Sequence, residues 1–166
     1  RYADGATEEF AYDENGNLIR FTDGLGRETA YTYDELDRRI KVAYDDGTYE
    51  AYEYDAGNSP TRARDSRGLW TQYEYDPVTH LLLRETTAHG TSGAVTITNT
   101  YDTYGNLQTR TGAGQSATYT YDGLDRVTSV RTLAGTESYT YDDVGNQLTV
   151  TDVSGLTVKQ EYDELG

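Results

Sequence analysis

Aromatic and polar residues alternate over short stretches of this chain, and the stretch Tyr31-Thr32-Tyr33-Asp34 shows the pattern clearly. Alternation places both rings on one face of a β-strand. The turn residues that bound such stretches leave strands of about six or seven residues. In most copies of the pattern an aromatic residue precedes the second ring by two places, at Phe10, Tyr31, Tyr52, Tyr73, Tyr119 and Tyr139.

The dipeptide Tyr-Asp ends each predicted strand and occurs eight times, at steps of 20 or 21 residues with a single step of 26. A fixed interval of this size indicates a repeat architecture. The motif consists of Tyr12, Asp13, Tyr33, Asp34, Tyr54, Asp55, Tyr75, Asp76, Tyr101, Asp102, Tyr121, Asp122, Tyr141, Asp142, Tyr162 and Asp163, together with Gly16, Gly105 and Gly145 in the following turns.

A tight turn is predicted after each Tyr-Asp. Aspartate suits the first position of a type I turn, because its carboxylate accepts hydrogen bonds from backbone N–H groups just ahead. In seven of eight copies, the third residue after the aspartate tolerates a left-handed backbone, as the three-residue hairpin loop with a bulge requires. We therefore expect positive φ at Gly16, Asp37, Asn58, Gly105, Asp125 and Gly145.

A second turn is predicted halfway through each unit. Asp23–Gly26, Asp65–Gly68 and Asp152–Gly155 share the spacing Asp-x-x-Gly, and Thr111–Gly114 and Thr132–Gly135 are expected to form the same turn with threonine in place of aspartate. Turns about every ten residues leave no room for a helix. The chain is predicted to be all-β, an antiparallel meander of hairpins with about fifteen strands.

The unit at 76–100 is irregular. Asp76–His80 lacks a residue suited to left-handed backbone at the third place after the aspartate, and Thr87–Gly93 predicts a longer turn. We expect a five-residue insertion that forms a longer loop. Residues 1–166 are thus predicted to be one array of about seven units. The array opens inside one repeat, with a strand end and turn at Arg1–Ala6, and stops inside another, so we expect a fragment of a longer chain.

Composition narrows the class of partner. The 29 Asp and Glu residues exceed the 14 Lys and Arg residues, for a formal net charge of −15. This balance argues against nucleic acid or an anionic membrane as partner, since both require a basic patch. The absence of cysteine excludes disulfides and thiolate chemistry. The 17 tyrosines suit a surface where a ring packs and its hydroxyl reaches water or a backbone group.

No constellation of catalytic residues stands out. The aspartate of Tyr-Asp recurs in every unit, whereas an active site needs one special place, so turn capping is its expected role. His80 and His89 could hold a metal with Glu85, although solvent-exposed loop positions are the favoured interpretation. Asp13–Asn17 lacks the spacing of a calcium loop. For Trp70, packing on other aromatic residues is favoured over ligand binding. We expect no catalytic residue, cofactor or metal.

The pattern Tyr-x-Tyr-Asp-x-x-Gly-x-Leu, followed by x-Asp-x-x-Gly, resembles the YD repeats of the rearrangement-hotspot (Rhs) family, whose relatives include toxin-complex C components and teneurins. Phe10–Leu18, Tyr119–Val127 and Tyr139–Leu148 carry it best. The resemblance implies a sheet that spirals into a hollow shell around a toxic C-terminal domain, or a barrel used for adhesion in teneurins. Asp76-Pro77 lacks the Gly-Leu of the self-cleaving core found in Rhs proteins, so no autoproteolytic site is expected.

On this resemblance we expect a non-enzymatic wall segment of a curved, spiralling Rhs-type shell that encapsulates a C-terminal toxin domain for delivery to competitor or host cells. Its partners would be the rest of the shell, the toxin domain and other copies through open strand edges. It would be secreted or lie at the cell surface after export by a specialised secretion system. The alternative is an extracellular module that binds carbohydrate or cell-surface partners through rows of tyrosine.

Open strand edges near Ala6 and Tyr162 predict salt-dependent association, because an unpaired edge can pair with another chain. The net charge of −15 opposes contact between copies, and added salt screens this repulsion. Sedimentation velocity is therefore expected to show larger species at high than at low ionic strength. A strictly monomeric species at both ionic strengths would contradict the open-edge hypothesis.

Overall fold

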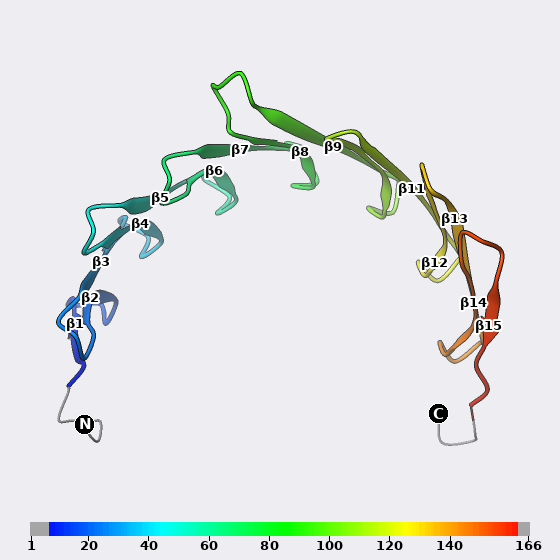
Figure 1. Cartoon of the computed structure of the whole chain (residues 1–166), viewed down its shortest axis with the longest axis horizontal. Coiled ribbons are helices and arrows are strands. Elements are labelled where there is room, and N and C mark those ends of the chain that lie inside the picture. The colour runs from blue at the N-terminus through cyan, green and yellow to red at the C-terminus, as the bar shows by residue number, and fades with distance from the viewer. Residues whose placement is uncertain (1–6, 163–166) are drawn as a thin grey trace. The chain divides into compact units, whose positions relative to one another are not determined.

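The strands of this chain follow one another along a single meander, shown in Figure 1 as a computed structural model that describes residues 7–162. The sheet order is the chain order, and every pairing described is antiparallel, so the predicted all-β meander is confirmed. Within residues 7–162 no helix could cross a membrane. The strand end expected at Arg1–Ala6 and the motif residue Asp163 lie outside the described residues.

The strands are β1 (Glu9–Tyr12), β2 (Leu18–Thr22), β3 (Glu28–Tyr33), β4 (Arg39–Tyr44), β5 (Tyr49–Tyr54), β6 (Pro60–Arg64), β7 (Trp70–Tyr75), β8 (Leu82–Thr87), β9 (Val95–Tyr101), β10 (Leu107–Gly112), β11 (Gln115–Tyr121), β12 (Val127–Thr132), β13 (Gly135–Tyr141), β14 (Gln147–Thr151) and β15 (Thr157–Lys159).

The chain divides into two compact units. The first contains the described residues up to Glu74 together with Thr86–Ala94, and the second contains Tyr75–Glu85 together with the described residues from Val95. Ladders join β1 to β7 in succession in the first unit and β9 to β15 in the second. Within each unit the sheet bends gradually from strand to strand, as twisted sheets do (Figure 1).

Each Tyr-Asp ends one strand and starts a three-residue hairpin loop. In the first hairpin Tyr12 lies opposite Leu18, and the amide N–H of Gly16 donates to the carbonyl of Asp13 at 3.1 Å. The register shifts by one residue just before the tyrosine, which is the expected bulge. Positive φ is confirmed at all six predicted positions, Gly16 (88°), Asp37 (57°), Asn58 (74°), Gly105 (92°), Asp125 (59°) and Gly145 (106°).

The turns at the other end of the hairpins are of two kinds. Asp23–Gly26, Asp65–Gly68 and Asp152–Gly155 close as predicted, with the glycine amide donating to the aspartate carbonyl at 2.9 to 3.0 Å. The prediction that Thr111–Gly114 and Thr132–Gly135 repeat this turn is wrong. In the first of these, Gly112 lies opposite Gln115, and in the second Thr132 lies opposite Gly135, so each loop has only two residues.

The shorter loops explain the repeat length. A two-residue loop needs less chain than the Asp-x-x-Gly turn between Thr22 and Glu28. The steps from Tyr101 to Tyr121 and from Tyr121 to Tyr141 contain these short loops, and both steps are 20 residues long. The steps with an Asp-x-x-Gly turn are 21 residues long. Loop type therefore sets the unit length.

The extra residues of the irregular unit are spread over several elements, so the expectation of one five-residue loop insertion is wrong. His80 takes the left-handed position, with φ 57°, and its amide donates to the carbonyl of Asp76 one residue later than in the other turns. The turn between β8 and β9 occupies residues 88–94 and is longer than the turn between Thr22 and Glu28, so the longer turn predicted at Thr87–Gly93 is confirmed.

Hardly any side chain is fully buried. Among residues 7–162 only Val42 and Asn99, each 4% exposed, belong to the buried class. Most strand residues are half-buried, because each face of a single sheet is covered only by the side chains of its neighbours. Hydrogen bonds within and between hairpins therefore carry a large share of the order in this structure.

The left-handed backbone at Gly16 predicts the effect of a substitution. Gly16→Val is expected to lower the free energy of unfolding by about 1–2 kcal/mol, because a branched side chain disfavours this backbone region. No atom lies within 4 Å of a Cβ built at Gly16, so crowding does not contribute. Urea denaturation measures the effect. Gly123→Val is the control, because Gly123 lies in an equivalent loop with an ordinary φ and equal space, and we expect a change below about 0.5 kcal/mol. Equal losses in both variants would contradict the turn assignment.

Candidate functional site: the joints between consecutive repeats

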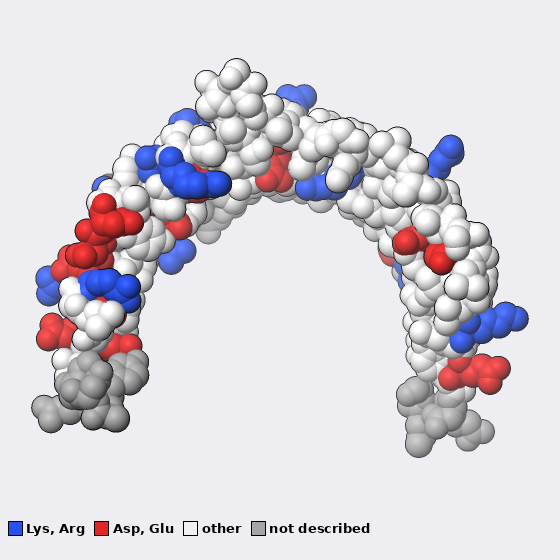
Figure 2. All heavy atoms as spheres, in the orientation of Figure 1, with Lys and Arg blue, Asp and Glu red and all other residues white. Residues whose placement is uncertain are grey.

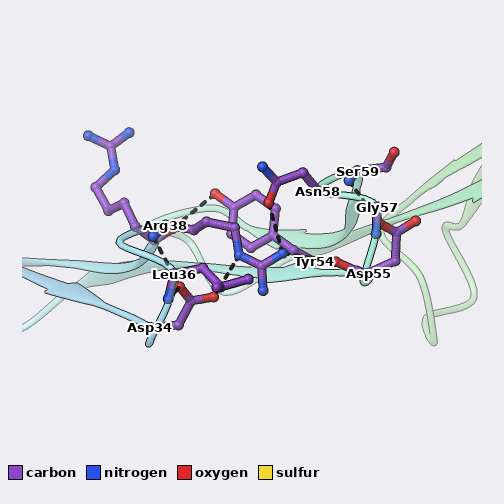
Figure 3. Close-up of polar contacts among 9 residues, drawn as sticks. Asp34, Leu36, Arg38, Tyr54, Asp55, Gly57, Asn58 and Ser59 are labelled. Carbon is purple, nitrogen blue, oxygen red and sulfur yellow. Dashed lines mark hydrogen bonds and ion pairs between the residues drawn. The ribbon is translucent and has the colours of Figure 1, made fainter.

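The aspartate of each Tyr-Asp caps its own turn. One carboxylate oxygen of Asp34 accepts hydrogen bonds from the amides of Leu36 at 2.9 Å and Arg38 at 3.0 Å (Figure 3). Asp122 does the same with Leu124 and Arg126. The remaining turns follow this scheme at Asp13, Asp55, Asp102 and Asp142, and Asp76 caps the amides of Val78 and Thr79.

Capping lowers the pKa of the carboxyl group at Asp13, Asp34, Asp76, Asp102, Asp122 and Asp142. At Asp23, in a turn at the other hairpin end, hydrogen bonds from the backbone and side chain of Arg27 lower the pKa below its ordinary value of 3.8. At Asp34 and Asp142 partial loss of hydration raises the pKa, but the hydrogen bonds to the carboxylate outweigh it and the pKa is lowered. The lowered pKa keeps these aspartates ionised, and the carboxylates stabilise the backbone of the turns. This role gives no reason to expect acid–base chemistry.

In six of the Tyr-Asp pairs the tyrosine joins its repeat to the preceding one. Its hydroxyl donates to the carbonyl of the residue that opens the second strand of the previous hairpin. The bonds run from Tyr33 to Leu18 (2.9 Å), Tyr54 to Arg39 (3.0 Å), Tyr101 to Leu82 (2.9 Å), Tyr121 to Leu107 (2.8 Å), Tyr141 to Val127 (2.9 Å) and Tyr162 to Gln147 (3.1 Å).

These hydroxyls act where the backbone ladder between repeats has ended. The β2–β3 ladder runs from Thr22 opposite Glu28 only as far as Arg20 opposite Ala30, so it stops before Leu18. The β10–β11 ladder likewise stops at Thr109 opposite Thr118. Adjacent repeats therefore separate towards the Tyr-Asp turns, and the tyrosine side chain spans the separation. Because Tyr33 and Tyr54 make equivalent bonds, their rings lie on the same face of the sheet.

The residue four places after the aspartate forms a second joint. Arg38 donates through Nε to Asp34 Oδ2 at 2.7 Å and through Nη1 to the carbonyl of Asp55 at 2.8 Å, and its guanidinium carbon lies 4.9 Å from the ring centre of Tyr54 (Figure 3). Arg38 Nη1 also donates to Asn58 Oδ1 at 3.0 Å. One side chain thus contacts its own turn and the turn of the next repeat.

Arg126 and two asparagines repeat this joint. Arg126 contacts Asp122 Oδ2, the carbonyl of Asp142 and the ring of Tyr141. Asn17 and Asn106 instead donate to the left-handed aspartate of the next repeat, Asp37 at 2.6 Å and Asp125 at 2.7 Å. Sequence reasoning missed this position, although polar residues occupy it at Asn17, Arg38, Ser59, Asn106, Arg126 and Asn146.

The other candidate residues have ordinary structural roles. Trp70 packs under Arg62, whose guanidinium carbon lies 4.2 Å from the indole centre. Glu85 lies 3.9 Å from Arg110 Nη2, and the amide of His89 donates to the carbonyl of Trp70. Within residues 7–162 no group of three or more His, Cys, Asp or Glu residues could hold a metal. On the face seen in Figure 2, the described acidic and basic side chains form small groups among uncharged residues.

Comparisons with known proteins agree with this geometry. The RHS repeat family model matches residues 12–49 and 101–137. A solved structure of the Photorhabdus luminescens Tc holotoxin pore, with a mutated TccC3, matches with 20% identity and a TM-score of 0.77, over 93% of this chain and 9% of that chain. The crystal structure of TcdB2-TccC3 matches with 20% identity and a TM-score of 0.74, over 93% and 10% of the two chains. TcdB2-TccC3 without the hypervariable C-terminal region matches with 20% identity and a TM-score of 0.74, over 87% and 9%.

These matches show a shared fold, and this chain spans 9% to 10% of the length of those three chains. None of the curated proteins matches the sequence.

Removal of a single tyrosine hydroxyl tests the joint. Tyr121→Phe is expected to lower the free energy of unfolding by about 1 kcal/mol, because it removes the bond to the Leu107 carbonyl. Tyr119→Phe is the matched control: Tyr119 lies in the same strand, is also half-buried and makes no hydrogen bond to any residue of 7–162. Urea denaturation of both variants measures the difference. Equal stabilities would contradict a role for the hydroxyl in joining repeats.

The lowered pKa values predict loss of stability in acid. A carboxyl group with a lowered pKa in the folded state contributes its full stabilisation above its unfolded pKa and loses it as the pH falls through the folded pKa. The loss is therefore expected below about pH 3.8. Urea denaturation between pH 7 and pH 3 measures it. Asp142→Asn keeps an oxygen that can accept from Val144 and Asn146 but cannot titrate, so its stability should depend less on pH than that of the original protein. The same pH dependence in both would contradict the assignment for Asp142.

Proposed function

We propose that this chain, in which residues 12–49 and 101–137 match the RHS repeat model, forms a wall segment of an Rhs-type shell that encapsulates a C-terminal toxin domain. In this proposal the toxin is delivered to competitor or host cells. The segment has a structural role and no catalytic turnover. Its partners are the rest of the same shell and the enclosed toxin domain. The shell is exported by a specialised secretion system and acts outside the producing cell or at its surface.

The recurring joint is the observation that carries this proposal. The same tyrosine hydroxyl bond links successive hairpins in each unit, and the Arg38 and Arg126 contacts reinforce it. Joints of one geometry extend a sheet by adding repeats, because each repeat contacts only its neighbours. With only Val42 and Asn99 buried among residues 7–162, the sheet is organised as a wall with two accessible faces.

A row of exposed apolar residues supports contact with an enclosed chain. In the second unit, the residue two places after the aspartate of each described Tyr-Asp pair is apolar or aromatic, and the Tyr-Asp turns project to the same side of the sheet (Figure 1). The exposed fractions are 83% for Val78, 83% for Tyr104, 66% for Leu124 and 84% for Val144. Exposed apolar residues in a regular row favour a surface that meets another part of the protein.

The alternative of carbohydrate binding through rows of tyrosine has less support. The hydroxyls of Tyr33, Tyr54, Tyr101, Tyr121 and Tyr141 are donated to backbone carbonyls. These hydroxyls already donate hydrogen bonds within the protein, so they cannot donate the same hydrogen atoms to a glycan. The wall therefore accounts for the motif better than a glycan-binding surface does.

Protection of the enclosed domain tests the proposal. In the product of the complete gene, the segment that follows the repeat array is expected to resist a protease that digests the same segment expressed alone. A double variant, Tyr121→Phe with Tyr141→Phe, should weaken two joints and increase cleavage of that segment. The matched control is Tyr119→Phe with Tyr31→Phe, which removes hydroxyls without hydrogen bonds in residues 7–162. Cleavage at the rate of the isolated segment would contradict encapsulation.

A further inference from the structure

A carboxylate is built into the aromatic face of the sheet in two repeats. Tyr52 donates its hydroxyl to Glu50 Oε2 at 2.5 Å, and Tyr139 donates to Glu137 Oε2 at 2.8 Å. In both cases the glutamate stands two residues before the tyrosine, on the same face of the strand. Tyr44 donates to the other carboxylate oxygen of Glu50 at 2.9 Å. A carboxylate at this position therefore accepts the hydroxyl of the tyrosine that follows it.

The position two residues before Tyr119 is occupied by Ala117 and therefore carries no carboxylate. The hydroxyl of Tyr119 makes no hydrogen bond to any residue in the described part of the chain, 7–162. It is also accessible to solvent, since no buried side-chain nitrogen or oxygen of those residues lacks a partner. Tyr119 thus retains the donor that Tyr52 and Tyr139 use internally.

A cation replaces the apolar residue opposite this position. Val42 pairs with Glu50 and Val130 pairs with Glu137, whereas Arg110 pairs with Ala117. Phe21 lies opposite Thr29 at the equivalent place before Tyr31. Neither Tyr119 nor Tyr31 has a hydroxyl bonded to any residue of 7–162, but only Tyr119 has a cation at this place, since Arg110 lies opposite Ala117 and Phe21 lies opposite Thr29.

Arg110 is held in place by a buried asparagine and keeps most of its donors. Asn99, 4% exposed, donates to the carbonyl of Leu82 at 2.9 Å and accepts a bond from Arg110 Nη1 at 3.3 Å. Glu85 Oε2 lies 3.9 Å from Arg110 Nη2. A guanidinium has five N–H donors, and these two long contacts leave donors available. The Arg110 side chain is 40% exposed.

An open groove of about 560 Å³ lies beside these groups, entirely within the second unit. Its lining includes Ile97, Arg110, Gly112, Ala117, Tyr119 and Leu133. Several of its other lining residues are small, and its volume is in the range of small-molecule sites. The groove therefore combines a guanidinium, a tyrosine hydroxyl and apolar walls.

We propose that this groove binds a carboxylate carried on an apolar stem. The carboxylate takes the place that Glu50 and Glu137 occupy in their own repeats, accepting from the Arg110 guanidinium and the Tyr119 hydroxyl, while the stem lies over Ala117 and Ile97. Charge-assisted bonds from arginine to a carboxylate are among the stronger hydrogen bonds in proteins. The carboxylate belongs to a free organic acid or to an acidic side chain of a polypeptide. This site is independent of the shell proposal.

Titration with butyrate tests the site, with butyramide as the uncharged control. In the whole chain with isotope-labelled tyrosine, butyrate is expected to shift the NMR signals of Tyr119 saturably, and butyramide is not. Arg110→Gln should weaken butyrate binding at least tenfold, and Tyr119→Phe should weaken it several-fold. Tyr139→Phe, outside the groove, should leave it unchanged. Equal shifts with butyrate and butyramide would overturn the proposal.

Ala117→Glu provides a second, independent test. It should restore the internal carboxylate found at Glu50 and Glu137, keep the chain folded by circular dichroism and abolish butyrate binding. Unchanged butyrate affinity in this variant would overturn the proposal. A blocked peptide with one glutamate, compared with its glutamine version, distinguishes the two sources. At least tenfold tighter binding of the glutamate peptide than of butyrate assigns a polypeptide ligand, and the reverse assigns a free acid.

Discussion

Hydrogen bonds from tyrosine hydroxyls to backbone carbonyls hold successive repeats together at Tyr33, Tyr54, Tyr101, Tyr121, Tyr141 and Tyr162. The backbone ladder between neighbouring hairpins covers only the half of the strands away from the Tyr-Asp turns, as between Arg20 and Ala30. Beyond this point the strands separate, and the Tyr33 hydroxyl reaches the Leu18 carbonyl across the separation. Phenylalanine could pack its ring there but could not donate this bond. The physical need for a long side chain with a terminal donor explains why the motif residue is tyrosine.

The aspartate beside that tyrosine makes the joint possible by fixing the turn. Asp34 accepts two amide bonds across its loop, and Asp37 supplies the left-handed residue that closes the loop. Asp37 then accepts the side chain of Asn17 from the previous repeat. A single turn therefore contributes to its own geometry and to the coupling between repeats. Because each coupling involves only adjacent repeats, stability is expected to depend on nearest neighbours.

The sequence allowed the hairpins, the bulges and the left-handed residues to be predicted, because these depend on local spacing and on the chemistry of Gly, Asn and Asp. The joints could not be predicted in the same way. Arg38 and the Asp55 carbonyl are 17 residues apart, and their contact depends on the strand register and on how far the ladders extend. Tyrosine hydroxyls were expected to reach water or backbone, but the pattern alone did not identify the carbonyls that accept them.

The carboxylate groove could not be predicted from the sequence, because it depends on a one-residue difference in the strand register that the loop sets. With the Asp-x-x-Gly type of turn at Thr111–Gly114, the register seen around Asp23, where Thr22 faces Glu28, would place Arg110 opposite Ser116. Ala117 would then lie on the other face, since adjacent residues of a strand point to opposite sides. The two-residue loop instead sets Arg110 opposite Ala117 and brings it to the face of Tyr119. Both residues of that loop adopt left-handed backbone, with φ 55° at Ala113 and 74° at Gly114. The left-handed backbone at Ala113 is a local exception, because alanine seldom adopts it. The strand register depends on it, and the register decides which side chains share a face.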